Sequence, residues 1–279
     1  MCRASKICFV SKTNYIIFVC IFFLSGCGGE AIINRAAFDP VTTRADAVQI
    51  IPAGVQEIYI ESDDRVRLQC FFVPYGASSG LIVYFHGNAG NIFARLPELQ
   101  NLSKTGISVL GVGYRGYGKS TGKPSEEGIY RDGRAAVKYA TENLGYSADK
   151  IFLCGRSLGS VVALETARNK NFAGLILVSP LASGADILRA HGYRVAPLLV
   201  GDVIDNMKKL AEIVSPVLII HGDKDEVVPW TMGKKIYLML SVSKKIVTIR
   251  GGAHSDLEFI DHQLYHGAIA QFIREQGVR

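Results

Sequence analysis

The most distinctive chemical feature of the chain is a serine between glycines, in Gly155-Arg156-Ser157-Leu158-Gly159. The run before it, Ile151-Phe152-Leu153-Cys154, favours a β-strand, and the residues after it favour a helix. G-x-S-x-G in this context is typical of a nucleophile elbow, in which glycines permit a tight turn with the serine at its tip. The first amides of the helix would carry partial positive charge toward an oxyanion formed there. The motif predicts Ser157 as a nucleophile.

A nucleophilic serine needs a histidine base, and the chain has six histidines. His86 and His221 each precede a glycine at the end of an apolar run, where packing is the simpler interpretation, and His191 has no assigned role. His254 lies in a glycine-rich loop directly after the last predicted strand. It follows Ser157 in the chain order serine, acid, histidine, so we predict it as the general base.

The acid should follow the preceding strand, in the loop Gly222-Asp223-Lys224-Asp225-Glu226-Val227-Val228-Pro229. Asp223, Asp225 and Glu226 are all available, and spacing alone does not choose between them.

A metal site is a separate possibility on the last predicted helix, where His262 and His266 stand four residues apart. Such a pair can hold a metal ion, but no third ligand is evident in the sequence, and an exposed helix face is the preferred interpretation. Phosphate-binding glycine motifs are also absent at the first strand. We therefore predict no metal and no organic cofactor.

From residue 55 onward, short β-branched runs alternate with longer segments of helical period, which predicts a mostly parallel sheet. The predicted strands are residues 56–60, 65–73, 81–85, 108–112, 150–154, 174–178, 217–220 and 245–249. The predicted helices are residues 92–104, 125–144, 158–169, 231–240 and 255–275. Residues 181–213 exceed a simple crossover and are predicted to form a small lid that selects the acyl group, with apolar candidates Ile187, Leu188, Val195, Leu198, Leu199 and Val200.

Several motifs together resemble the α/β-hydrolase family over residues 55–275: Tyr84-Phe85-His86-Gly87-Asn88-Ala89-Gly90-Asn91, Tyr114-Arg115-Gly116-Tyr117-Gly118-Lys119-Ser120 and Ser215-Pro216-Val217-Leu218-Ile219-Ile220-His221-Gly222. The resemblance implies an α/β-hydrolase fold with about eight strands and helices on both faces. The family's H-G-x-x-D-x-x-V-P loop implies Asp225 as the triad acid, with Asp223 as the alternative. Its H-G-x turn implies that the amides of Asn88 and Leu158 bind the oxyanion, and the Tyr114 and Tyr117 segment should brace that turn.

The short lid and Ser179-Pro180-Leu181-Ala182-Ser183-Gly184 are similar to a branch that includes membrane-associated protein depalmitoylases. That resemblance implies cleavage of carboxylic esters or thioesters through an acyl-enzyme. Ser255 follows His254 where that branch often has Asn, which leaves the substrate open. Two alternatives stand beside it: a serine peptidase of the same fold and a non-catalytic binding protein on a hydrolase scaffold. A dehalogenase would need a carboxylate at position 157.

The N-terminus has the pattern of an export signal. Three basic residues precede the apolar run at residues 15–24, which is too short for a bilayer span of about 20 residues. Leu24-Ser25-Gly26-Cys27 resembles a bacterial lipobox, which implies cleavage after residue 26, a lipid on Cys27 and location on the outer membrane facing the periplasm. We therefore expect a signal at residues 1–26, a tether at 27–54 and a hydrolase domain at 55–279.

Charge and cysteine content limit the partners and the thiol chemistry that the chain can have. Residues 1–26 hold three of the 31 basic residues and none of the 25 acidic ones, so the rest of the chain has a formal charge of +3. Basic residues are scattered, so we expect no nucleic-acid partner. Beyond Cys27 only Cys70 and Cys154 remain, both in strand-like runs and expected as buried thiols. We expect a monomer.

Overall fold

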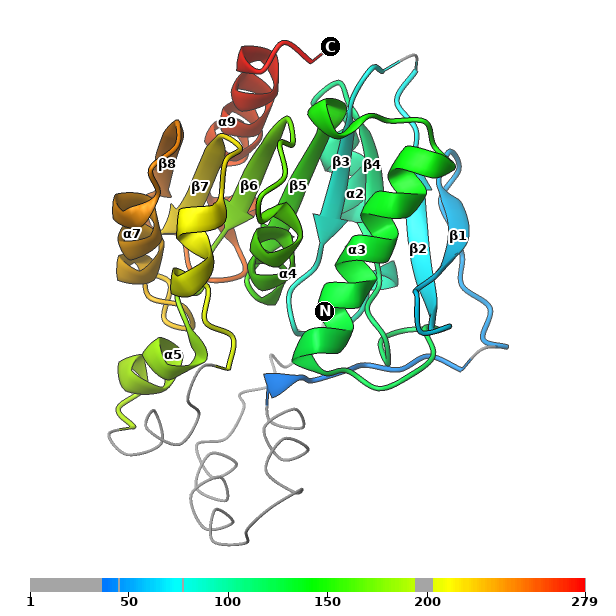
Figure 1. Ribbon diagram of the computed structural model, residues 1–279, viewed down its shortest axis with the longest axis horizontal. Coiled ribbons are helices and arrows are strands. Elements are labelled where there is room, and N and C mark those ends of the chain that lie inside the picture. Colours follow the sequence, from blue (N-terminus) through cyan, green and yellow to red (C-terminus); the bar gives the residue numbers. More distant parts are fainter. Residues whose placement is uncertain (1–36, 45, 77, 194–202, 279) are drawn as a thin grey trace, which may run out of the picture. The chain divides into compact units, whose positions relative to one another are not determined.

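A single eight-stranded sheet organises the protein in the computed structural model, which describes residues 37–44, 46–76, 78–193 and 203–278 (Figure 1). The strand order is β1-β2-β4-β3-β5-β6-β7-β8. The strands are β1 Gln56–Glu61, β2 Arg67–Val73, β3 Leu81–Phe85, β4 Ser108–Val112, β5 Ile151–Arg156, β6 Gly174–Val178, β7 Val217–Gly222 and β8 Lys244–Ile249. β2 pairs antiparallel with β1 and β4, and every other pairing is parallel. The mostly parallel sheet predicted from the sequence is confirmed.

The central strands are buried from end to end. All five residues of β3, β4 and β6 are buried, since each has helices packed on both of its faces. Continuous runs of β-branched and aliphatic residues suit such strands because both faces of the pleat meet apolar side chains. This explains why the sequence located them without ambiguity.

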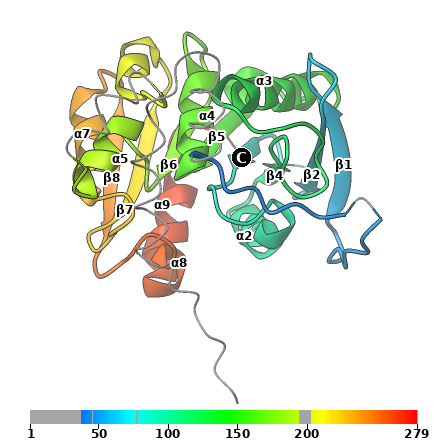
Figure 2. The same cartoon turned by 90° about the horizontal axis from the view of Figure 1, so that it is seen from below.

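Helices cover both faces of the sheet (Figures 1 and 2). α3 (Glu126–Glu142), α4 (Leu158–Ala167) and α7 (Trp230–Met239) lie on one face, and α2 (Leu96–Ser103) and α9 (His262–Glu275) lie on the other. Short turns of 3-10 helix precede α2 (η2, Phe93–Arg95) and β5 (η3, Ala148–Lys150). The α2 and α9 side chains pack on the sheet in one buried cluster, which includes Leu99, Tyr84, Ile176 and Phe272.

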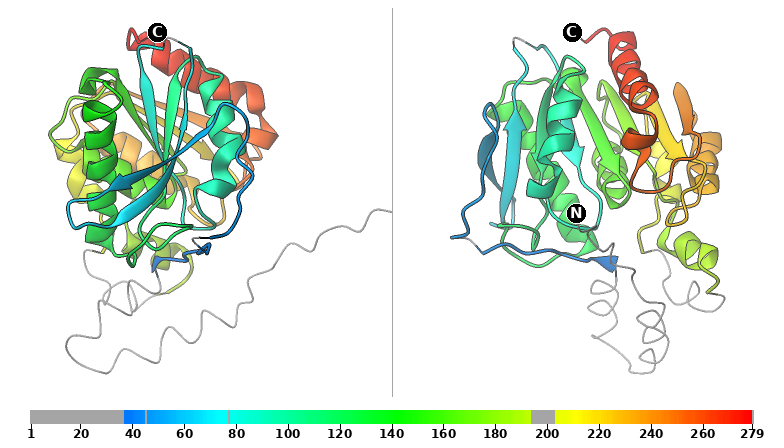
Figure 3. Two further views of the ribbon diagram at one scale, coloured as in Figure 1. Left: turned by 90° about the vertical axis from the view of Figure 1, so that its right-hand side faces the viewer. Right: turned by 180° about the vertical axis from the view of Figure 1, so that it is seen from behind.

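The C-terminal helix differs from its prediction. Instead of one helix over residues 255–275, a short α8 (Leu257–Ile260) is separated from α9 by Asp261, whose backbone is extended at φ −145° and ψ 82°. The Asp261 carboxylate accepts a hydrogen bond from the amide of Leu264 and caps α9. The chain therefore turns at this residue, between α8 and α9. The view from behind shows this end of the chain in orange and red (Figure 3).

The lid region contains α5 (Gly184–Ala190) and η4 (Met207–Glu212), with a bridge between Ser183 and Asp205. Ile187 and Leu188 are half-buried on α5, whereas the predicted pocket residues Val195, Leu198, Leu199 and Val200 lie outside the described residues.

The folded unit begins earlier than the sequence indicated, at Phe38 rather than at residue 55. Phe38 is buried, and Thr42 forms a bridge with Gly118, so the later part of the expected tether packs on the sheet domain. The expected signal and Cys27 lie outside the described residues. Within the described part of the chain, no helix is long and apolar enough to cross a membrane.

Candidate active site

Ser157 stands in a strained turn between β5 and α4. Its backbone has φ 50° and ψ −116°, a conformation that is unfavourable for a residue with a side chain. The turn is held by a hydrogen bond from the Ser157 amide to the carbonyl of Val178 on β6 (2.9 Å). Strain retained in this way projects the side chain past the carboxyl ends of the parallel strands.

The two flanking glycines are required by close contacts. A Cβ on Gly155 would lie 2.3 Å from the carbonyl oxygen of Gly159, and one on Gly159 would lie 2.0 Å from that of Phe85. Any side chain at either position would push α4 away from β3 or open the turn. The motif therefore sets how closely the elbow approaches the loop after β3.

The structure brings together the three residues predicted as nucleophile, base and acid, from three separate loops. His254 Nε2 lies 3.0 Å from Ser157 Oγ, and His254 Nδ1 lies 2.8 Å from Asp225 Oδ2. A carboxylate only accepts hydrogen bonds, so Nδ1 carries the hydrogen and Nε2 is free to accept the one on Ser157. The arrangement can transfer the serine proton to the imidazole as the oxygen attacks an electrophile.

Asp225 is buried beneath the imidazole and is fully hydrogen-bonded. Its Oδ1 accepts from the amides of Val227 (3.0 Å) and Val228 (2.7 Å), and its Oδ2 faces both His254 and Nε2 of His221 (3.3 Å). Burial raises the pKa of the Asp225 carboxyl. Hydrogen bonds from His221 and His254 lower the same pKa by a larger amount, so the net pKa lies well below its usual value. Asp225 is thus held as a fixed negative charge.

The structure gives His221 a contact beyond the strand-end packing that the sequence predicts for it. Its fully buried ring bonds the carbonyl of Val228 through Nε2 (2.8 Å) while facing Asp225, so it fixes the acid loop to the end of β7. Its place four residues before Asp225, as the histidine of the H-G-x-x-D pattern, was the available signal in the sequence.

The alternative acid, Asp223, has a different position. Its Oδ1 accepts a hydrogen bond from the amide of Gly251 (2.7 Å), which anchors the start of the loop that carries His254. Asp256 supports the other end of that loop by accepting from the amide of Ala253 (2.7 Å). Both carboxylates hold the histidine loop without contacting the imidazole, and Glu226 is exposed.

The loop after β3 lies against the elbow. A Cβ on Gly87 would lie 3.6 Å from Cβ of Ser157, so the backbone next to Asn88 reaches the nucleophile. The Asn88 side chain is held by two donors, the hydroxyl of Tyr117 (2.6 Å) and the amide of Asp39 (2.9 Å). The position of Asn88 and Leu158 beside Ser157 suits the predicted role of their backbone amides as oxyanion donors.

The Tyr114–Tyr117 segment braces this loop, as its resemblance implied. Tyr114 donates to the carbonyl of His86 (2.9 Å), and both tyrosine rings pack on the His86 ring at centroid distances of 4.4 and 5.4 Å. Burial lowers the pKa of His86 to about 4. His86 therefore stays neutral and structural. Next to Tyr114, Arg115 bonds Asp132 and Asp64 at distances of 2.7 to 3.1 Å.

Sequence reasoning missed one positioning residue, the arginine inside the elbow. Arg156 donates from Nη2 to the carbonyl oxygen of His254 (3.1 Å) and from Nη1 to the carboxylate of Glu98 on α2 (3.4 Å). Both charged side chains are almost buried, at 12% and 10% exposure. The guanidinium thus ties the loop that carries the base to the turn that carries the nucleophile. Arg156 and His254 are 98 residues apart, so only the fold reveals the contact.

Comparison with known proteins relates this geometry to a family. A family model described as serine aminopeptidase, S33, matches residues 76–199. An uncharacterized protein of Mycobacterium tuberculosis is 33% identical over 236 residues, which cover 83% of each chain. The alpha/beta hydrolase domain-containing protein 17C of Mus musculus is 32% identical over 75% of this chain, which spans 65% of the length of that relative.

Solved structures confirm the fold class. The Pyrococcus furiosus esterase Pf2001 superposes with a TM-score of 0.71 at 20% identity, covering 86% of this chain and 97% of that one. Est1E of Butyrivibrio proteoclasticus, solved with ferulic acid bound, gives a TM-score of 0.66 at 24% identity, covering 78% and 98%. At these identities the likeness establishes the α/β-hydrolase fold and leaves the substrate open.

Proposed function

Since the chain belongs to the α/β-hydrolase family, we propose that it is a serine hydrolase that cleaves carboxylic esters or thioesters through an acyl-enzyme on Ser157. One observation carries the proposal: the continuous hydrogen-bonded line from Ser157 through His254 to Asp225, with links of 3.0 and 2.8 Å. The esterases among the fold neighbours are consistent with it.

The first half of the reaction forms the acyl-enzyme. Ser157 Oγ attacks the acyl carbonyl carbon while its proton passes to Nε2 of His254, and the carbonyl oxygen becomes an oxyanion. The negative charge on Asp225 stabilises the imidazolium that results. The amides of Asn88 and Leu158 stabilise the oxyanion, which collapses as the leaving alcohol or thiol takes the proton from His254.

The second half restores the enzyme. Water gives a proton to His254 and attacks the acyl carbon, the second oxyanion collapses, and Ser157 leaves with that proton as the acid departs. Apart from this water, the steps use only side chains and backbone amides of the chain.

A lipid anchor on Cys27 would favour acyl substrates at a membrane surface. Ten residues lie between Cys27 and the buried Phe38, and a fully extended chain over these eleven steps reaches at most about 40 Å. The next residue, Asp39, bonds the side chain of Asn88. We therefore propose a monomeric lipoprotein of the bacterial outer membrane, facing the periplasm, in which this length of chain joins the lipidated Cys27 to the sheet domain. Metabolic labelling with an alkyne fatty acid should mark the wild type and spare Cys27→Ser.

A serine peptidase is the second candidate, because the matched family model is described as a serine aminopeptidase. The same triad would then cleave an amide. Comparing kcat/KM for p-nitrophenyl acyl esters, acyl thioesters and aminoacyl p-nitroanilides separates the two, and preference for the anilides would reject the ester proposal.

The decisive experiment is labelling with a fluorophosphonate, which reports an activated serine whatever the substrate. Mass spectrometry should locate the adduct on Ser157, and labelling should be lost in Ser157→Ala and His254→Ala. Ser255→Ala is the matched control, since it removes an exposed hydroxyl directly after His254 and should label normally. Failure of the folded wild type to label, with and without detergent, would indicate a binding protein on a hydrolase scaffold and reject the proposal.

A further inference from the structure

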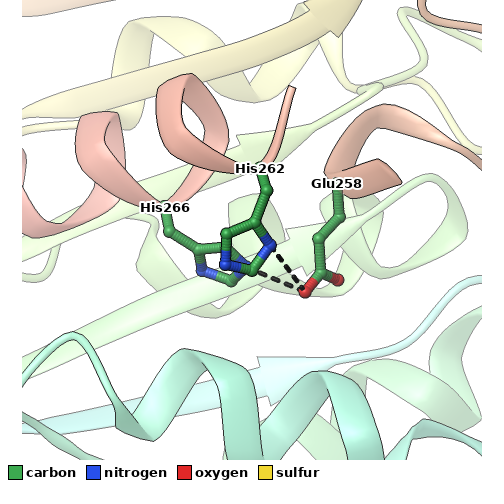
Figure 4. Close-up of side chains that lie close together, drawn as sticks. All are labelled: Glu258, His262 and His266. Atoms are coloured by element: carbon green, nitrogen blue, oxygen red, sulfur yellow. Dashed lines mark hydrogen bonds and ion pairs between the residues drawn. The ribbon is translucent and has the colours of Figure 1, made fainter. Parts of the chain in front are cut away.

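Three side chains converge where α8 meets α9, on the α9 side of the sheet and apart from the triad. We propose that Glu258, His262 and His266 form a binding site for a divalent transition metal ion of the Zn²⁺ class. Their ligand atoms all lie within 4.8 Å of one another. Figure 4 shows both imidazole rings turned toward one carboxylate oxygen. The inference is independent of the proposed hydrolase activity.

The break at Asp261 creates this cluster. In one continuous helix, Glu258 and His266 would be eight residues and about 12 Å apart along the axis, too far to share an ion. Because the chain turns between α8 and α9, Glu258 Oε1 instead lies 2.9 Å from Nε2 of His266. Since the sequence predicted an unbroken helix, the histidine pair lacked a visible third ligand.

The spacing of the ligand atoms suits a small ion. His262 Nδ1 lies 3.8 Å from the same Oε1 of Glu258, and the two imidazole centroids are 4.4 Å apart. Ligand atoms of tetrahedral zinc, each about 2.1 Å from the ion, are about 3.4 Å apart. Shifts of less than about 1 Å, within the freedom of side-chain rotation, would therefore complete the coordination.

The chemistry of the donors favours zinc over harder cations. Two imidazoles and one carboxylate are a common ligand set for Zn²⁺, whereas Mg²⁺ and Ca²⁺ prefer oxygen ligands alone. Within the described part of the chain, both ion pairs of Glu258 are with these histidines. Asn101 on α2 donates to Glu258 Oε1 (2.6 Å) and holds the carboxylate in place.

The site also has an accessible side. The side chain of His262 is 67% exposed, while those of His266 and Glu258 are 12% and 16% exposed. An ion could enter from solvent past His262 and keep water in its remaining coordination positions. Glu258 is four residues after His254, so a bound ion would hold α8 against α9 and brace the segment that follows the catalytic loop.

Isothermal titration of EDTA-treated protein with Zn²⁺ tests the site. We expect one equivalent to bind to the wild type, with affinity at least about 10-fold weaker in His262→Ala and in Glu258→Gln. His262→Ala removes an exposed ring and Glu258→Gln keeps the size of the side chain, so both variants should fold. His191→Ala is the matched control, since it removes an exposed histidine from the lid and should bind like the wild type.

A Co²⁺ spectrum gives a second test of the proposed metal site. Co²⁺ should give the visible absorption of a tetrahedral or five-coordinate site in the wild type, and His262→Ala should lose it. No binding of Zn²⁺ up to about 100 μM, or binding that is equal in the wild type and His262→Ala, would overturn the proposal.

Discussion

Replacing the arginine within the nucleophile elbow separates its structural role from its positioning role. Arg156→Gln leaves the Glu98 carboxylate nearly buried and without its guanidinium, which should lower the free energy of unfolding by about 3 kcal/mol. Loss of the hydrogen bond to the His254 carbonyl adds about 1 kcal/mol. For a chain of this size, the sum should lower the thermal midpoint by roughly 10 °C.

Catalysis should fall for a different reason. Without the link of 3.1 Å from Arg156, the His254 loop is less firmly held against the elbow, and a small displacement of the base reduces kcat. We expect a loss of about 10- to 100-fold in kcat with little change in KM. The assay is hydrolysis of a p-nitrophenyl acyl ester at a temperature where every variant is folded.

Glu98→Gln supplies the matched comparison. It removes the same ion pair but retains the bond from Arg156 to His254, so it should lose stability while keeping a kcat near that of the wild type. In the double variant, the two stability losses should be less than additive, because no buried charge remains unpaired. Equal kcat in the folded Arg156→Gln and Glu98→Gln variants would refute the positioning role, and fully additive losses would refute the ion pair.

Three further predictions concern the acid and the elbow. Asp225→Asn should lower kcat by about 10⁴-fold in steady-state kinetics, because it removes the charge that orients and stabilises the imidazole. In the same assay, Asp223→Asn should leave kcat nearly unchanged, because it retains an acceptor for the amide of Gly251. Because the pKa of Asp225 is lowered in the folded state, the unfolded chain binds this proton more readily, and the stability from this group is present above about pH 4 and is lost as the pH falls. Urea unfolding between pH 5 and 3 should therefore show a smaller loss of unfolding free energy in Asp225→Asn than in the wild type. Gly159→Ala should lower the free energy of unfolding by about 3 kcal/mol, because its methyl group would lie 2.0 Å from the Phe85 carbonyl oxygen. A urea midpoint equal to that of the wild type would contradict the close contact.

The sequence determined the sheet well because local pattern and final environment agree. β3, β4 and β6 are continuous apolar runs that end up buried on both faces, and their observed limits match the predicted ones. The C-terminal helix was predicted as one piece because its residues have helical period on both sides of Asp261. A single aspartate can continue a helix or cap a new one, and tertiary contacts decide between the two.

The site residues were also predictable from the sequence only in part. Ser157 and His254 followed from local motifs, whereas the choice of Asp225 over Asp223 needed a family resemblance, since both carboxylates lie in one polar loop. The contact between Arg156 and His254 was beyond sequence reasoning, because pairings between distant loops depend on how strands are ordered in the sheet.

The position of β8 gives the three triad residues unequal local stability. Ser157 follows a central strand with neighbours on both sides. His254 follows β8, an edge strand whose one neighbour in the sheet, among the described residues, is β7 and which is mostly half-buried. Opening of an edge strand requires far less free energy than global unfolding. We therefore expect local openings in which the base leaves the nucleophile while the rest of the sheet remains intact. On heating, such local opening would remove activity before the protein unfolds, and amide exchange would be faster in β8 than in β5.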